Sequence, residues 1–321
     1  MSDKKKALLI VNPCAGKNKS RAGTFDIIDR LSREDYEFDA KTTTRQGEAT
    51  EIVKNYIDGN DFVICCGGDG TLNETINGIM QLSRRVPVGY IPTGSTNDLA
   101  STIGLPTKSV KDATDIIIDG HTNGYDIGLF NNRFFSYIAS FGALTSLSYN
   151  TSQKLKNVFG HNAYVLDGLM HVPTHLKSAK PMHARVECDG RVYEDDFYFG
   201  AVSNSVSVAG TFKYDPKEIR LDDGKFEVLL VRGIKRPTDL VALLLKAVKG
   251  DFNDERILFF KTTGAKFKFD KPVKWTLDGE YGGEHKEIRI SILNKAIDIY
   301  SPENELFCGE EKDEREYAYD D

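Results

Sequence analysis

The chain has 321 residues, of which 40% are hydrophobic and 28% charged, an ordinary globular balance in a chain long enough for two domains. Its formal net charge of -6 argues against nucleic acid as the main partner, because binding to a phosphate backbone requires a basic surface. No apolar run approaches the ~20 residues of a membrane-spanning helix, and the N-terminus has no signal-peptide pattern, so we expect a cytoplasmic protein.

The first 120 residues alternate short strand-like runs with segments whose apolar residues recur at helical spacing. The strand-like runs predict strands at 6–11, 36–42, 62–66 and 86–91. The intervening segments predict helices at 25–31, 48–57, 72–79 and 110–118. Strands that alternate with helices of this length indicate an α/β layer with mostly parallel strands.

The pattern changes near residue 121, where short alternating strands and tight turns take over. The predicted strands lie at 124–130, 133–141, 184–187, 193–203, 226–231, 265–269, 273–277 and 287–292. Such a run indicates an antiparallel, all-β second domain. Helices are expected within 143–176 and at 240–248, and a frayed, charged tail from 309 onward.

The turn after the third predicted strand is the most informative stretch, Gly67-Gly68-Asp69-Gly70-Thr71. A strand, a glycine turn and a helix together present backbone N–H groups and a positive helix end to a phosphate. Asp69 would repel that phosphate unless a cation lay between them. The turn therefore predicts a nucleoside triphosphate with Mg²⁺, and phosphoryl transfer as the chemistry.

Three acids follow strand ends or turns: Asp69, Asp98 and Asp126. The first two follow strands of the α/β part, so they are expected to face one crevice, and Asp126 lies where a second domain would cover it. Carboxylates are ligands that suit Mg²⁺. The alternative is that Asp98 caps a short helix after Asn97 and that Asp126 is an ordinary acid at a strand end.

Two later turns allow a plain and a functional interpretation. Leu277-Asp278-Gly279-Glu280 carries the Asp-Gly signal of a hairpin, and Glu280 in it is also a candidate general base. Arg220 to Phe226 is an acidic turn that fits either a hairpin or a cation bound through one carboxylate and neighbouring carbonyls. The residues alone leave both choices open.

Taken together, four motifs in this order resemble the soluble bacterial diacylglycerol kinase and lipid kinase family, whose catalytic core eukaryotic diacylglycerol, sphingosine and ceramide kinases share. The motifs are Asn12-Pro13-x-x-Gly16, Gly67-Gly68-Asp69-Gly70-Thr71, Pro92-x-Gly94-Ser95-x-Asn97-Asp98 and Leu277-Asp278-Gly279-Glu280. The resemblance covers nearly the whole chain. It implies an ATP-binding α/β domain at 1–122, completed by about 297–321, and a β-sandwich lipid-substrate domain at 123–296, with the active site in the cleft between them.

The resemblance also implies roles for individual residues. ATP would contact Asn12, Pro13, Cys14, Ala15, Gly16, Thr43, Gly68, Asp69, Gly70, Thr71, Leu72, Asn73, Glu74 and Ser95. Asp69, Asp98 and Asp126 would organise the catalytic Mg²⁺, largely through waters, and Glu280 would be the base. A structural Mg²⁺ would bind Asp223 and the carbonyls of Arg220 and Lys225. Ala15 and Ser95 depart from the family pattern, where a hydroxyl residue and Thr are common.

The expected function is that of an ATP-dependent lipid kinase that converts diacylglycerol to phosphatidic acid. Alternatives are a kinase for another lipid alcohol, such as a sphingoid base, phosphatidylglycerol or a prenol, and a non-catalytic nucleotide- or lipid-binding regulator. The substrate implies transient contact with a membrane surface, for which segment 143–176 and the lysines at 266, 268, 271 and 274 are candidates. Both sets also fit ordinary core and surface positions. The family resemblance further allows a homodimer.

Overall fold

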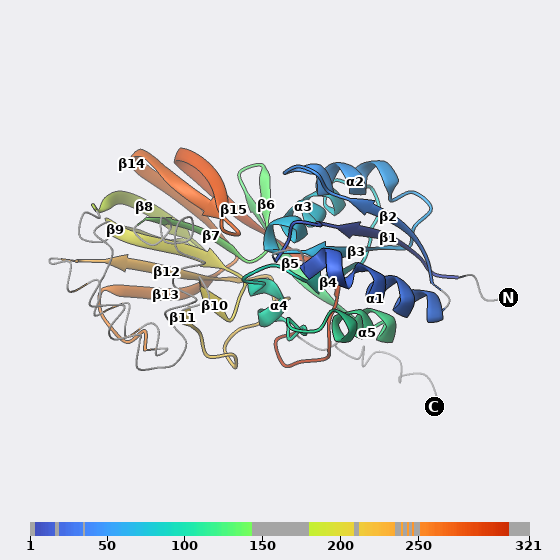
Figure 1. The fold of residues 1–321 in the computed structure, drawn as a ribbon. Coiled ribbons are helices and arrows are strands. Elements are labelled where there is room, and N and C mark those ends of the chain that lie inside the picture. The colour runs from blue at the N-terminus through green and yellow to red at the C-terminus, as the bar shows by residue number, and fades with distance from the viewer. Residues whose placement is uncertain are drawn as a thin grey trace, which may run out of the picture.

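The computed structural model describes residues 4–16, 19–34, 36–142, 180–208, 212–234 and 251–307, with 239, 243 and 246. Figure 1 shows two halves side by side, one with helices packed around strands and one made almost wholly of strands. The predicted segments at 143–176 and from 309 onward lie outside the described residues, as does most of 240–248. Within the described residues, no helix is long and apolar enough to span a membrane.

The first half is a parallel sheet with helices between its strands. The strands are β1 (Lys6–Val11), β2 (Glu37–Thr42), β3 (Phe62–Gly67) and β4 (Val88–Pro92), paired in the order β4-β3-β1-β2. The helices are α1 (Lys19–Arg33), α2 (Glu48–Tyr56), α3 (Asp69–Ile79), α4 (Asp98–Thr102) and α5 (Val110–Asp119). The sequence predicted these strands, and the helices α2, α3 and α5, to within a few residues, whereas α1 begins six residues before the predicted start at residue 25.

Alternating residues of each central strand face opposite layers of helices. On β1, Leu8 and Ile10 pack with α2 and α3, whereas Leu9 and Val11 pack with α1 and α5. Both faces are therefore buried, which explains why β1 and β3 read as continuous apolar runs rather than as alternating strands.

The second half is antiparallel. Its strands are β5 (Thr122–Phe130), β6 (Arg133–Phe135), β7 (Ile138–Gly142), β8 (Met182–Cys188), β9 (Arg191–Ser203), β10 (Ser207–Val208), β11 (Phe212–Lys213), β12 (Phe226–Arg232), β13 (Ile257–Thr262), β14 (Gly264–Leu277) and β15 (Glu280–Tyr300). Strand β8 pairs with both β9 and β14, which are also joined through β7, so these strands close around an aromatic core that includes Trp275.

Strand β15 connects the two halves. It pairs antiparallel with β14 and β5, and its residue Ile299 pairs in parallel with Val88 of β4. The chain beyond it packs against the first half, where the Asn304 amide donates to the Ile103 carbonyl. One continuous sheet therefore runs from β2 through β15 into the second half.

The sequence was wrong about several boundaries in the second half. The predicted strand 133–141 is two strands, because the backbone N–H groups of Ser136 and Tyr137 turn toward the Asp278 carboxylate. The predicted strands 265–269 and 273–277 are one strand, with Pro272 inside a break in the register. Strand β15 extends well beyond 287–292 in both directions, and β13 was missed.

Candidate active site

A cleft of about 790 Å³ lies where the turns of the α/β half face β6 and the start of β15. Its α/β side comes from residues after β1, β2, β3 and β4, as expected because parallel strands present their carboxyl ends at one edge. The predicted site residues that line it are Asn12, Cys14, Ala15, Gly16, Thr43, Gly68, Gly70, Thr71, Asn73, Glu74, Ser95 and Glu280. Pro13, Asp69, Leu72, Asp98 and Asp126 are not among its lining residues.

Two turns on the α/β side approach each other at backbone distance. A Cβ atom added at Gly94 would lie 2.6 Å from the Gly68 Cα, and one added at Gly68 would lie 3.2 Å from the Gly94 Cα. Real side chains do not tolerate the shorter contact, so the turns after β3 and β4 require glycine where they meet. The glycines thereby bring bare backbone to the floor of the cleft.

The turn after β1 is tied to the first turn of α3. The side-chain amide nitrogen of Asn12 donates to Thr71 Oγ1 over 2.9 Å. Its side-chain oxygen Oδ1 accepts from the Cys14 N–H over 3.0 Å. Helix α3 begins at Asp69, so the N–H groups and positive dipole end of its first turn lie at the cleft. This arrangement suits the binding of an anion such as phosphate.

Asp69 lies behind this surface. The backbone N–H groups of Asn97, Asp98 and Leu99 donate to its carboxylate, while its Oδ1 is buried with no hydrogen-bond partner among the described residues. Burial is the main cause that raises the pKa of Asp69, and the nearby charge of Asp278 adds to the increase. An orphaned buried carboxylate oxygen fits a cation such as Mg²⁺, which would satisfy it.

Glu280 reaches the cleft from the other half of the molecule. The Gln46 amide donates to Glu280 Oε2 over 3.4 Å, and a Cβ atom added at Gly70 would lie 3.5 Å from Glu280 Oε1. The carboxylate of Glu280, the first residue of β15, is thus held next to the glycine turn. Gln46 and Arg133 also line the cleft, although no sequence motif pointed to them.

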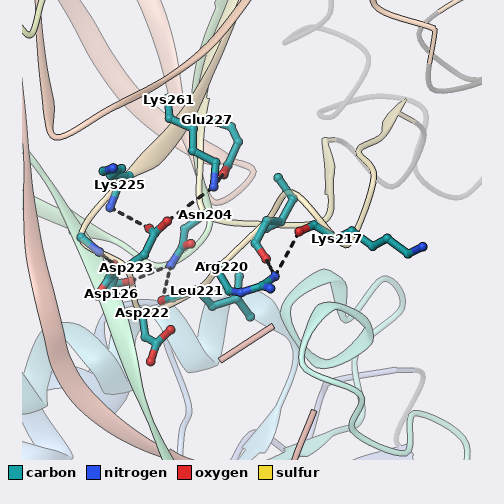
Figure 2. Close-up of polar contacts among 12 residues, drawn as sticks. Asp126, Asn204, Lys217, Arg220, Leu221, Asp222, Asp223, Lys225, Glu227 and Lys261 are labelled. Carbon is teal, nitrogen blue, oxygen red and sulfur yellow. Dashed lines mark hydrogen bonds and ion pairs between the residues drawn. The ribbon is translucent and has the colours of Figure 1, made fainter. Parts of the chain in front are cut away.

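Asp126 lies beside the turn at 222–224 (Figure 2). Its Oδ2 accepts from the Gly224 N–H over 2.6 Å, and its Oδ1 accepts from the Asn294 amide and the Lys295 N–H. Burial raises its pKa, although these donors oppose that effect. Both oxygens are engaged by the protein in joining three segments of the β half.

The predicted structural metal site is the same turn (Figure 2). Asp223 Oδ1 accepts from the Lys225 N–H over 3.0 Å, and its Oδ2 lies 3.4 Å from Lys261 Nζ. The Arg220 guanidinium points away from Asp223 and donates to the carbonyls of Lys217 and Ile219. The Arg220 side chain therefore does not block Asp223.

No sequence motif singled out Glu227, which lies close to this turn (Figure 2). Its side chain is fully buried, and neither carboxylate oxygen has a hydrogen-bond partner among the described residues. The side-chain oxygen Oδ1 of Asn204 is likewise buried without a partner among these residues. Burial raises the pKa of Glu227 to about 8, against the opposing charge of Lys261, whose Nζ is 3.7 Å from Oε1. Its only sequence signal is an acid inside the apolar run of β12. The lack of hydrogen-bond donors around this buried carboxyl favours its protonated form.

Comparison with known proteins agrees with the fold. Residues 6–130 match the family described as diacylglycerol kinase catalytic domain, and residues 143–301 match the YegS C-terminal NAD kinase beta sandwich-like domain. The diacylglycerol kinase of Bacillus subtilis (strain 168) is 32% identical over 281 residues, which cover 87% of this chain and 91% of that protein. The diacylglycerol kinase of Staphylococcus aureus (strain MRSA252) is 32% identical over 301 residues, or 93% of each chain.

A crystal structure of a diacylglycerol kinase from Bacillus anthracis str. Sterne has the same fold, with a TM-score of 0.75 at 24% sequence identity. It covers 94% of this chain and 99% of that one. The fold and the matched domains define a lipid kinase. The chain belongs to the diacylglycerol kinase family, as the sequence motifs predicted.

Proposed function

We propose that this protein transfers the γ-phosphoryl group of ATP to the hydroxyl group of diacylglycerol, giving phosphatidic acid and ADP. The position of Glu280 carries the proposal. A carboxylate from the β half reaches the glycine turn that begins α3, and both line the same cleft. A protein that only bound a nucleotide would have no need for a base at that place.

The chain's own residues supply binding and proton transfer. The N–H groups of the Gly68–Glu74 turn and the turn at Asn12–Gly16 bind the phosphates of ATP. Glu280 accepts the proton of the lipid hydroxyl as its oxygen bonds to the γ-phosphorus, while the bond from that phosphorus to the oxygen of the leaving ADP breaks. Bound Mg²⁺ supplies charge neutralisation at the phosphates, and Asp69, through its orphaned Oδ1, and Asp98 are the residues that would hold it.

The acceptor is a lipid, so the cleft must meet it at a membrane surface, and we propose a transient, peripheral contact. The lysines at 266, 268, 271 and 274 are exposed, but Lys268 lies 3.4 Å from Glu287, so its charge is shared with an acid. Their arrangement fits the solvent face of β14 as well as a lipid-binding surface.

The test is phosphate transfer from radiolabelled ATP, with Mg²⁺, to a panel of lipid alcohols in mixed micelles. Wild type is compared with Glu280→Gln and with Glu284→Gln, which changes an exposed glutamate four residues along the same strand. We expect label in phosphatidic acid with wild type and Glu284→Gln. With Glu280→Gln we expect kcat to fall by ~10²-fold or more, because a positioned base contributes about that much.

Each other outcome identifies a different error. Label in another lipid would keep the mechanism and change the acceptor. Full activity of Glu280→Gln would remove that residue from its role as base. ATP binding without transfer to any lipid of the panel would contradict the proposal and favour a regulator.

A further inference from the structure

Asp278 lies two residues before the proposed base, in the turn between β14 and β15, and its carboxylate accepts four hydrogen bonds. Its Oδ2 accepts from the Ser136 N–H and the Asn73 amide, both over 2.6 Å. Its Oδ1 accepts from the N–H groups of Tyr137 over 2.9 Å and Ile138 over 3.0 Å. The residue is only 4% exposed, so these four donors take the place of water.

The donors fit an ionised carboxylate. Each oxygen faces two N–H donors, so a proton on either oxygen would point at a donor rather than at an acceptor. Among the described residues, no Lys, Arg or His forms an ion pair with Asp278; backbone and amide dipoles stabilise its charge. Moving this buried charge away from its donors would cost free energy, so the donors fix the position of the turn.

Asp278 also shapes the turn that carries Glu280. Its φ is 49° and that of Gly279 is 82°, the left-handed values of a tight two-residue hairpin. Its own N–H donates to the Ile138 carbonyl over 2.8 Å, and Leu277 pairs with Glu280 across the turn. The Asp278 side chain and backbone therefore both attach this turn to β7.

The bond to Asn73 crosses between the two halves of the molecule. Asn73 lies on α3, one turn after Gly70, the residue that faces Glu280. The same helix that begins at the glycine turn thus holds the turn that presents the carboxylate. Asp126, in contrast, makes its contacts within the β half.

We propose that Asp278 is a positioning residue that holds the β14–β15 turn against α3 and thereby keeps Glu280 over the glycine turn. The inference rests on the proposed function, because it takes Glu280 as the base. It assigns Asp278 no contact with substrate or metal, since the four donors around its carboxylate all belong to the protein.

The test compares steady-state kinetics of wild type, Asp278→Asn, Glu280→Gln and the double variant. We expect Asp278→Asn to lower kcat by about 10- to 100-fold with little change in the KM for ATP, since small displacements of a reacting group cost about that much. In the Glu280→Gln background the same change should have almost no further effect, because a residue that acts through Glu280 has nothing left to position. A purely structural role would lower kcat equally in both backgrounds.

Asp189→Asn is the matched control. Asp189 and Gly190 form a hairpin turn with φ values of 45° and 77°, and Asp189 likewise accepts from a backbone N–H, that of Thr263 over 3.1 Å. This turn does not line the cleft, so the control should keep the wild-type kcat. Wild-type kcat in Asp278→Asn, or additive losses in the double variant, would overturn the inference.

Asn73→Ser covers the case in which Asp278→Asn does not fold. It removes the bond between the halves and leaves the three backbone donors to Asp278 in place. We expect a smaller loss of kcat that again disappears in the Glu280→Gln background, and unchanged kcat would contradict the inference. Wild-type activity of Glu280→Gln itself would show instead that the proposed base is wrong.

Discussion

Glu74 on α3 caps the start of α2 at Gly47. Its Oε1 accepts from the Gly47 N–H over 2.7 Å, and its Oε2 accepts from the Ala49 N–H over 3.2 Å. Gly47, the N-cap residue of α2, has no side chain with which to cap the helix itself. A residue that the family resemblance implied as an ATP contact therefore also holds the turn after β2, which lines the same cleft.

Glu74→Ala should lower both stability and nucleotide affinity. Loss of a cap costs about 1 kcal/mol in the free energy of unfolding, and the freed turn at 43–47 should weaken ATP binding. Urea unfolding and calorimetric titration with ATP measure the two effects. Lys54→Ala, which removes a bond from the other end of α2 to Gln81 just after α3, should change neither by a comparable amount. Unaltered ATP affinity in Glu74→Ala would mean that the turn does not depend on its cap.

Alanine substitutions at Gly94 and Gly70 should have different effects, the first on stability and the second on turnover. Gly94→Ala places a methyl group 2.6 Å from the Gly68 Cα, so the backbone must move, and we expect a loss of about 1–3 kcal/mol in the free energy of unfolding. The methyl group of Gly70→Ala would contact only Glu280 Oε1, at an ordinary distance of 3.5 Å, so this variant should fold like wild type. Its turnover should fall, because the added methyl group faces the proposed base. Thermal unfolding and phosphate transfer separate the two. Equal melting temperatures for the two variants would refute the close approach.

The buried carboxyl of Glu227 should make stability depend on pH. Burial raises its pKa in the folded protein to about 8, above the usual value of 4.5, so the folded state keeps a proton that the unfolded state releases between these values. The stability that Glu227 contributes is therefore present below pH ~4.5 and is lost as the pH rises toward about 8.

Glu227→Gln removes this dependence. We expect its melting temperature to gain on that of wild type as the pH rises from ~5 to ~8. Glu284→Gln, an exposed glutamate, should follow the wild-type pH profile. Parallel profiles for wild type and Glu227→Gln would show that this carboxyl does not titrate in that window.

A divalent cation at Asp223 is the remaining prediction of the sequence, and we propose that it stabilises the turn at 220–225. A chelator should lower the melting temperature of wild type without nucleotide, and added Mg²⁺ or Ca²⁺ should restore it. Asp223→Asn should respond to neither, whereas Asp215→Asn, in the same loop but facing solvent, should behave like wild type. Lys261→Met should bind the cation more tightly, because it removes an ammonium group 3.4 Å from Asp223. A wild type that ignores the chelator would contradict the metal.

The order of elements in the first half could be predicted because each follows from a local pattern. Apolar runs mark β1 and β3, and helical spacing marks α2 and α5. The second half was harder. Pro272 reads as a strand break by itself, and only its place in a register shift lets β14 continue through it.

The sequence by itself determined the class of protein, since its glycine turns and their order along the chain carry the chemistry of phosphate binding and the family resemblance. Only the tertiary structure decided what individual acids do. The Asp126 carboxylate accepts from Gly224 and Asn294 in the β half, whereas Asp278 is the hairpin residue that its Asp-Gly signal predicted and also joins the two halves next to the cleft. The reason is physical: a turn motif depends on neighbouring residues, but the donors around a buried carboxylate come from segments as far as 205 positions away.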